Sequence, residues 1–198
     1  MIFRLWLTGE VVGEVNRYII GVGSAGINIL NHLSQSKILG ADLIAIDTDL
    51  QKLHHSKADC SLYLGEEKHR VHELVNNTIG LLTSAYRQAS VIYLLAGFGG
   101  KTATAAVPIL AREAKKRGVT VHLLAVEPML FEGQAKSGDA LTIIDELKGE
   151  LDSVVRLSNE DMSNLFSDDK PLVKGFSQAN EVFARIISEA ESVDFSVH

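Results

Sequence analysis

Two glycine-rich stretches hold the residues of this chain that are best suited to bind a phosphorylated ligand. The first reads Gly21-Val22-Gly23-Ser24-Ala25-Gly26, and the second reads Ala96-Gly97-Phe98-Gly99-Gly100-Lys101-Thr102-Ala103-Thr104. Each follows an apolar run and precedes a segment with helical spacing, which predicts a turn from a strand into a helix. Glycine lets the backbone approach a ligand closely, and the first free N–H groups of a helix attract anions. The two stretches therefore predict a phosphate site.

An acidic residue after the next apolar run leaves the kind of nucleotide open. Asp47 follows the first glycines by about twenty residues, which is also the spacing at which NAD-binding domains place the acid that holds the ribose. The second glycine stretch favours a compact polyphosphate instead, because NAD-binding folds do not require a glycine-rich turn after a later strand. Gly100-Lys101-Thr102 also resembles the end of a P-loop, but Leu95 stands where that motif needs glycine or alanine.

Short apolar runs alternate with longer segments of helical spacing along most of the chain. Strands are predicted at residues 17–22, 42–46, 91–96, 119–126 and 153–157, and helices at 25–34, 70–88, 102–117, 135–151 and 173–191. This alternation predicts an α/β fold with a doubly wound, mainly parallel sheet and helices on both faces. In such folds, ligands bind beyond the carboxyl ends of the strands.

Composition narrows the class of protein. The chain has 198 residues, of which 46 % are hydrophobic and 22 % charged, so a globular core is expected. A net charge of −6 argues against nucleic acid as a partner.

The apolar start, residues 1–7, is too short to span a membrane, and no membrane partner is expected. The single cysteine, Cys60, and the lack of a secretory signal predict a cytoplasmic protein. No metal site is predicted, because the adjacent His54 and His55 and the pair His69 and His72 lack further ligands.

Six motifs occur in a fixed order along the chain. They are Gly-Val-Gly-x-x-Gly-x-Asn from Gly21 to Asn28, Asp47-Thr48-Asp49 with Gln51 and Leu53, the second glycine stretch, Pro128 with Phe131-Glu132-Gly133, Asn159, and Phe176-x-x-Ala179-Asn180-Glu181. In this order they resemble the GTP-binding domain of the FtsZ/tubulin family, and the bacterial FtsZ-like branch fits best. The resemblance implies a nucleotide-binding domain over residues 17–191 with a shortened central helix. Residues 1–16 would be an N-terminal extension and 192–198 a tail, with the C-terminal domain of the family absent.

The resemblance also implies roles for individual residues, with GTP or GDP as the ligand and Mg²⁺ as an ion that could accompany GTP. Three sets of residues follow from it. The phosphates would lie along Gly21, Gly23, Ser24, Ala25 and Gly26. Asn28, at the start of the following helix, and Asp47, after the next strand, would belong to the same nucleotide site. The outer phosphates would meet Gly97, Gly99, Gly100, Lys101, Thr102, Ala103 and Thr104, with Lys136 near the terminal phosphate. The ribose would contact Glu132, and the guanine would contact Asn159, Phe176 and Asn180.

Departures from the family pattern bear on activity. Lys101, Ala103 and Ala105 replace glycines of the family's second loop, and the loop around residues 63–70 is shortened. In the family, acidic residues from the next subunit support hydrolysis; Asp194 matches the first of them, whereas Val197 stands in place of the second. We therefore expect no catalytic residue, weak or no GTP hydrolysis, and a role through a filament of FtsZ type, a division protein or self-association. Two alternatives stay open: an NAD(P)-binding oxidoreductase domain, and a nucleotide-free scaffold in which Lys101 fills the phosphate site.

Overall fold

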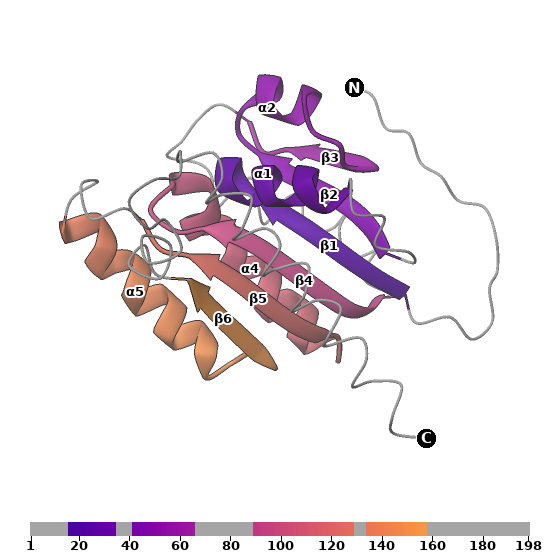
Figure 1. The fold of residues 1–198 in the computed structure, drawn as a ribbon. Coiled ribbons are helices and arrows are strands. Elements are labelled where there is room, and N and C mark those ends of the chain that lie inside the picture. The colour runs from indigo at the N-terminus through magenta and orange to yellow at the C-terminus, as the bar shows by residue number, and fades with distance from the viewer. Residues whose placement is uncertain (1–15, 35–40, 66–88, 129–133, 158–198) are drawn as a thin grey trace, which may run out of the picture.

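A single parallel sheet forms the centre of the protein (Figure 1). The structure, a computed structural model, describes residues 16–34, 41–65, 89–128 and 134–157. Six strands lie in the order β3-β2-β1-β4-β5-β6, and every neighbouring pair is parallel. Their bounds are Asn16–Val22 (β1), Ala41–Asp47 (β2), Cys60–Tyr63 (β3), Ala89–Gly97 (β4), Thr120–Val126 (β5) and Ser153–Leu157 (β6).

Helices cover both faces of this sheet (Figure 1). The described helices are α1 (Gly23–Leu33), α2 (Leu50–His54), α4 (Lys101–Lys116) and α5 (Gln134–Lys148). Along β1, Ile20 packs in the core cluster that contains α4 and α5 residues, whereas Ile19 packs in the cluster that contains α1 residues. The α/β fold with a doubly wound parallel sheet is therefore confirmed.

Burial on both faces explains why the strands read as continuous apolar runs. Six consecutive residues of β4, from Val91 to Ala96, are all buried. A parallel sheet between two helix layers needs apolar side chains on both faces, so an alternating polar pattern is absent. The core lies along the central strands and fixes the positions of the turns that leave their carboxyl ends.

The observed elements differ from the sequence prediction at several boundaries and in two elements that the sequence did not reveal. Helix α1 begins at Gly23 rather than residue 25, and β1 includes Asn16. Helix α5 ends at Lys148 rather than residue 151, because Gly149 follows and begins a turn. The elements α2 and β3 were missed: α2 has only 5 residues and β3 only 4, too few for a periodic pattern to emerge. The helices predicted at 70–88 and 173–191 lie outside the described residues, as do residues 1–15 and 192–198.

Candidate functional site

The two glycine stretches meet at the carboxyl ends of β1 and β4, the central pair of the sheet. We name residues 21–26 the first glycine loop and residues 97–104 the second glycine loop. From β1 the chain passes through α1 to β2 on one side, and from β4 it passes through α4 to β5 on the other. The loops therefore flank the point where the strand order reverses, which is where doubly wound sheets bind ligands.

Glycine is required for the two loops to pack this closely. A Cβ atom on Gly26 would lie 2.1 Å from the carbonyl oxygen of Leu95, and one on Gly97 would lie 2.5 Å from the Cβ of Ala25. Gly23 has a φ of +71° and is 3.8 Å, measured from its ideal Cβ position, from the backbone nitrogen of Ala103. The first loop thus lies against β4, and its turn into α1 lies beside the first turn of α4.

Helix α4 presents an uncapped N-terminus at this point. Its N-cap residue, Gly100, has no side chain that could accept a hydrogen bond from the first turn. Thr104 donates instead to the Gly100 carbonyl from its backbone N (3.2 Å) and from its Oγ1 (2.8 Å). Because the first N–H groups of a helix have no partner within the helix, an anion between the loops would find donors from α4 as well as from α1.

A buried carboxylate lies at the end of β2, next to the second glycine loop. Asp47 is only 3 % exposed. Its Oδ1 accepts a hydrogen bond from the backbone N of Thr48 (2.6 Å), and the Oγ1 of Thr48 lies 3.1 Å from the Oγ1 of Thr102 in α4. Its Oδ2 is buried without a hydrogen-bond partner among the described residues. A buried polar atom of this kind marks a place for a water, an ion or a ligand group.

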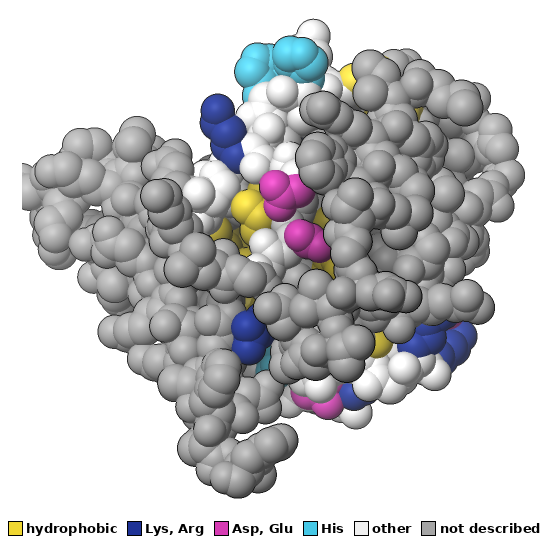
Figure 2. All heavy atoms as spheres, turned by 90° about the vertical axis from the view of Figure 1, so that its right-hand side faces the viewer, with side chains coloured by type: hydrophobic (Ala, Val, Ile, Leu, Met, Phe, Trp, Pro, Cys, Tyr) yellow, Lys and Arg dark blue, Asp and Glu magenta, His cyan; other side chains and the backbone are white. Residues whose placement is uncertain are grey.

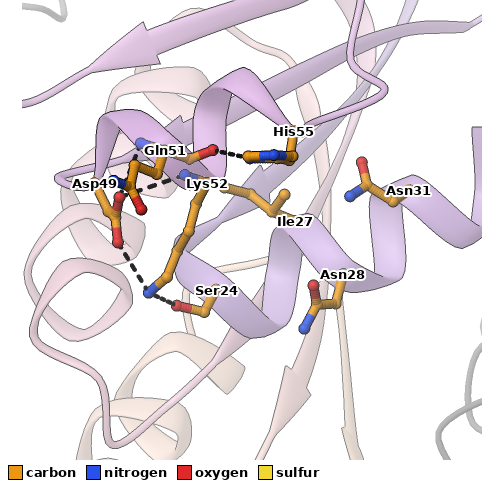
Figure 3. A pocket seen from close by; sticks show the side chains of 8 residues that line it. All are labelled: Ser24, Ile27, Asn28, Asn31, Asp49, Gln51, Lys52 and His55. Carbon is orange, nitrogen blue, oxygen red and sulfur yellow. Dashed lines mark hydrogen bonds and ion pairs between the residues drawn. The ribbon is translucent and has the colours of Figure 1, made fainter.

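A lysine from α2 reaches the start of α1 (Figure 3). The Nζ of Lys52 lies 2.5 Å from the Oγ of Ser24 and 3.6 Å from the Oδ2 of Asp49. Asp49 caps α2 through its Oδ1, which accepts from the backbone N of Gln51 (2.9 Å) and of Lys52 (3.3 Å). Hydrogen bonding from the backbone of Lys52, with that of Gln51 and the lysine charge, lowers the pKa of Asp49.

A hollow of about 340 Å³ opens beside this contact, between α1 and α2 (Figure 3). Its lining is polar except for one residue and consists of Ser24, Ile27, Asn28, Asn31, Asp49, Gln51, Lys52 and His55. Asn28, which the resemblance places at the nucleotide, therefore faces the same hollow as Ser24. Lys52 was not singled out from the sequence, because it lies on the missed helix α2. An aspartate at an N-cap with lysine three residues on would have been the available signal.

Lys101 is exposed at the first position of α4 and forms no hydrogen bond or ion pair with the described part of the chain. Of the other expected site residues, the side chain of Lys136 is not described although its backbone belongs to α5. Glu132, Asn159, Phe176 and Asn180 lie outside the described residues. The structure thus brings together the expected phosphate residues and is silent on the ribose and base residues.

The amino ends of the strands carry a separate acidic group. Figure 2, which shows the side of the molecule at the right of Figure 1, has acidic side chains near its middle. Asp59 Oδ2 accepts a hydrogen bond from the backbone N of Leu43 (2.8 Å) at this end of β2. Burial, with the nearby charge of Asp59, raises the pKa of Asp42. Asp59 thus binds the β2–β3 connection to the sheet, and both acids lie at the opposite end from the glycine loops.

Comparison with known proteins agrees with this geometry. Residues 16–167 match the sequence profile described as "Tubulin/FtsZ family, GTPase domain". The chain belongs to the tubulin/FtsZ family. It is 27 % identical over 194 residues to the cell division protein FtsZ of Aquifex aeolicus (strain VF5), covering 93 % of this chain and 53 % of that protein.

Solved structures of the family share the fold. The empty FtsZ dimer of M. jannaschii has a TM-score of 0.76 and 26 % identity, covering 88 % of this chain and 53 % of that one. CetZ2 from Haloferax volcanii, solved as a GTPγS-bound protofilament, has a TM-score of 0.75 at 20 % identity, covering 93 % and 60 %. The chain spans about half the length of FtsZ relatives that it matches. Among the described helices, none has the length and apolar character to cross a membrane.

Proposed function

We propose that this chain binds GTP or GDP between its two glycine loops. The observation that carries the proposal is the meeting of the α1 and α4 N-termini at the switch point of the sheet, where a Cβ added to Gly23 would lie 3.8 Å from the backbone nitrogen of Ala103. Two helix N-termini supply several N–H donors and partial positive charge to one region, which suits a chain of phosphates better than a single carboxylate. Membership of a GTPase family supports guanine as the base.

The proposed contacts of the two glycine loops follow from where the loops lie, and the others follow from the resemblance to the family. The first glycine loop and Ser24 would hold the inner phosphates, and Gly99, Gly100, Thr102 and Thr104 the outer ones. Glu132 would contact the ribose, and Asn159, Phe176 and Asn180 the guanine. Lys101 and Lys136 would add charge at the outer phosphates. Lys101 is free to do so, since it is exposed at the start of α4.

A Mg²⁺ ion fits the acidic residues beside the second glycine loop. Asp47 keeps one buried oxygen without a partner among the described residues, and Asp49 is held ionised by its cap. Mg²⁺ prefers one or two carboxylates together with phosphate oxygens and water. When bound with GTP, the ion would neutralise phosphate charge, while Asp47 and Asp49 would orient its water shell.

We propose that hydrolysis by the 198-residue chain is weak or absent. Val197 has no carboxylate at the position where the resemblance places the second acid, and activation of water needs a positioned acceptor. The protein would then act in the cytoplasm by binding itself, a filament of FtsZ type or another division protein. Sedimentation with and without an FtsZ filament tests this role; no change in assembly or GTP turnover would contradict it.

The nucleotide proposal is tested by mass spectrometry of the ligand released from denatured protein, followed by calorimetric titration with GTP, GDP and NAD. We expect guanine nucleotide to be released or to bind. Binding of NAD without guanine nucleotide would support the second candidate instead, an NAD(P)-binding oxidoreductase domain. That candidate is favoured by the strand order β3-β2-β1-β4-β5-β6, which dinucleotide-binding folds share, and by Asp47 at the end of β2.

A scaffold that binds no nucleotide is the third candidate, and the Lys101→Gly variant tests it. If Lys101 blocks the phosphate site, its removal creates affinity for nucleotide. The exposed position of Lys101 favours the opposite result, a loss of affinity or no change.

A further inference from the structure

The position of Lys52 is electrostatically unusual for a protein without a bound anion. Its ammonium lies 2.5 Å from the Oγ of Ser24, the second residue of α1. The N-terminus of a helix carries partial positive charge, which repels a cation. The nearest described counter-charge is the carboxylate of Asp49 at 3.6 Å. Since both side chains of that pair are more than two-fifths exposed, at 47 % and 43 %, the pair stabilises the position only weakly.

We infer that Lys52 is a phosphate ligand of this site and supplies there part of the positive charge that a divalent cation would otherwise provide. The inference rests on the proposed nucleotide function and goes beyond it, because it assigns the counter-charge for the phosphates to a side chain of α2. A phosphate at the start of α1 would accept hydrogen bonds from the N–H groups of that helix and from the Nζ of Lys52, which contacts Ser24 there.

Asp49 has two tasks in this arrangement. Its Oδ1 caps α2 and so fixes the helix that carries Lys52, and its Oδ2 lies 3.6 Å from the ammonium on the side of α2 that faces α1 (Figure 3). The lysine is thereby oriented before a ligand arrives, which lowers the entropic cost of using a long side chain.

The buried carboxylate beside the glycine loops explains why phosphate binding needs a cation there. Asp47 is 3 % exposed, and its Oδ2 has no partner in the described part of the chain. A buried carboxylate beside the phosphate loops repels an anion, so a phosphate can bind there only if positive charge offsets it. Lys52 supplies that charge without a metal, whereas Mg²⁺ would add to it.

The inference predicts that nucleotide binding persists without Mg²⁺ and then depends on Lys52. GDP affinity is measured by calorimetry on the full chain, in excess Mg²⁺ and in EDTA, for the wild type, Lys52→Met and Lys57→Met. Lys57 is the matched control, because it is an exposed lysine on the same connection. Among the described residues, only its backbone N is bonded, to the Oδ1 of Asn31. In EDTA we expect Lys52→Met to bind roughly 10- to 100-fold more weakly, the range of a lost charge-assisted hydrogen bond. We expect Lys57→Met to match the wild type.

Mg²⁺ should restore part of the GDP affinity that Lys52→Met loses in EDTA. Lys52→Arg should keep most of the GDP affinity of the wild type. Equal affinity of Lys52→Met and wild type in EDTA would overturn the role of Lys52 while leaving nucleotide binding intact. Tighter binding by Lys52→Met would also overturn it, because the lysine would then block the site. If the wild type binds no nucleotide in either buffer, both this inference and the proposed function fail. Thermal unfolding of each variant shows whether the fold is kept.

Discussion

Gly26→Ala is the sharpest test of how the first glycine loop is packed. Gly26 is the fourth residue of α1, and an added Cβ would lie 2.1 Å from the carbonyl oxygen of Leu95 and 3.1 Å from its carbonyl carbon. Ordinary contact between a carbon and a carbonyl oxygen needs about 3.3 Å, the lower end of weak C–H···O contacts. Either α1 or β4 must therefore move by about 1 Å.

The size of the effect follows from two opposing terms. Overpacking costs about 3 kcal/mol, the upper end of the usual range, because the obstacle is the backbone of a central strand rather than a flexible side chain. Alanine also stabilises a helix by about 1 kcal/mol relative to glycine. The net result is a protein that is about 2 kcal/mol less stable, which still leaves a folded majority for a domain of ordinary stability.

Gly138→Ala is the matched control. Gly138 also lies within a helix, α5, but a Cβ there would meet nothing within 4 Å. Only the helix term remains, so we expect Gly138→Ala to be about 0.5 to 1 kcal/mol more stable than the wild type. Urea unfolding followed by circular dichroism measures both variants. If Gly26→Ala is as stable as Gly138→Ala, α1 does not pack on β4 as described, and the argument that the two loops meet is wrong.

Three further predictions concern charged groups of the described structure. Asp47→Asn should raise the urea midpoint by an amount equivalent to about 1 kcal/mol, because it removes a buried carboxylate whose Oδ2 has no described hydrogen-bond partner. The same variant should bind Mg²⁺ with GTP more weakly. A lower urea midpoint would show that the carboxylate has a stabilising partner. Arg112→Ala removes two hydrogen bonds to Glu150 (2.7 and 2.9 Å) on the surface and should cost less than about 1 kcal/mol, with most of the loss gone in high salt; a salt-independent loss would point to packing instead. Burial alone would raise the pKa of Asp152, but hydrogen bonds from Lys115 and the backbone N of Val121 lower it. Asp152 therefore stabilises the fold above its unfolded pKa of about 3.9 and loses that effect as the pH falls through the folded value. The difference in urea midpoint between wild type and Asp152→Asn should shrink in acid, and a difference that stays constant with pH would contradict this prediction.

The sequence predicted the sheet because its strands obey one simple rule. Strands buried on both faces must be continuous apolar runs, and the run Val91–Ala96 has no other good interpretation beside a glycine turn. The position of the glycine loops was predictable for the same reason, since glycines after two such runs must lie at one edge of a parallel sheet. That the N-termini of α1 and α4 lie close together followed from the family and from the order of strands rather than from any local pattern.

The contact of Lys52 with Ser24 could not be predicted in this way. It depends on α2, a helix of 5 residues whose existence is decided by a single capping carboxylate, Asp49, and by one buried leucine, Leu53. Helices this short have no periodicity to detect and owe their stability to tertiary packing. The hydrogen bond between Thr48 and Thr102, beside the buried Asp47, likewise exists only in the folded chain.

The bond between Thr48 and Thr102 joins residues 54 apart in the sequence. The site is therefore assembled late during synthesis on the ribosome: at about 5 to 20 residues per second, Thr48 waits roughly 3 to 11 s for Thr102 to be made. Until then, the apolar edge of β1 that later pairs with β4 has no neighbour. Nucleotide cannot assist the early steps of folding, and the newly made chain passes through a period in which an unpaired central strand is exposed to aggregation or to chaperones.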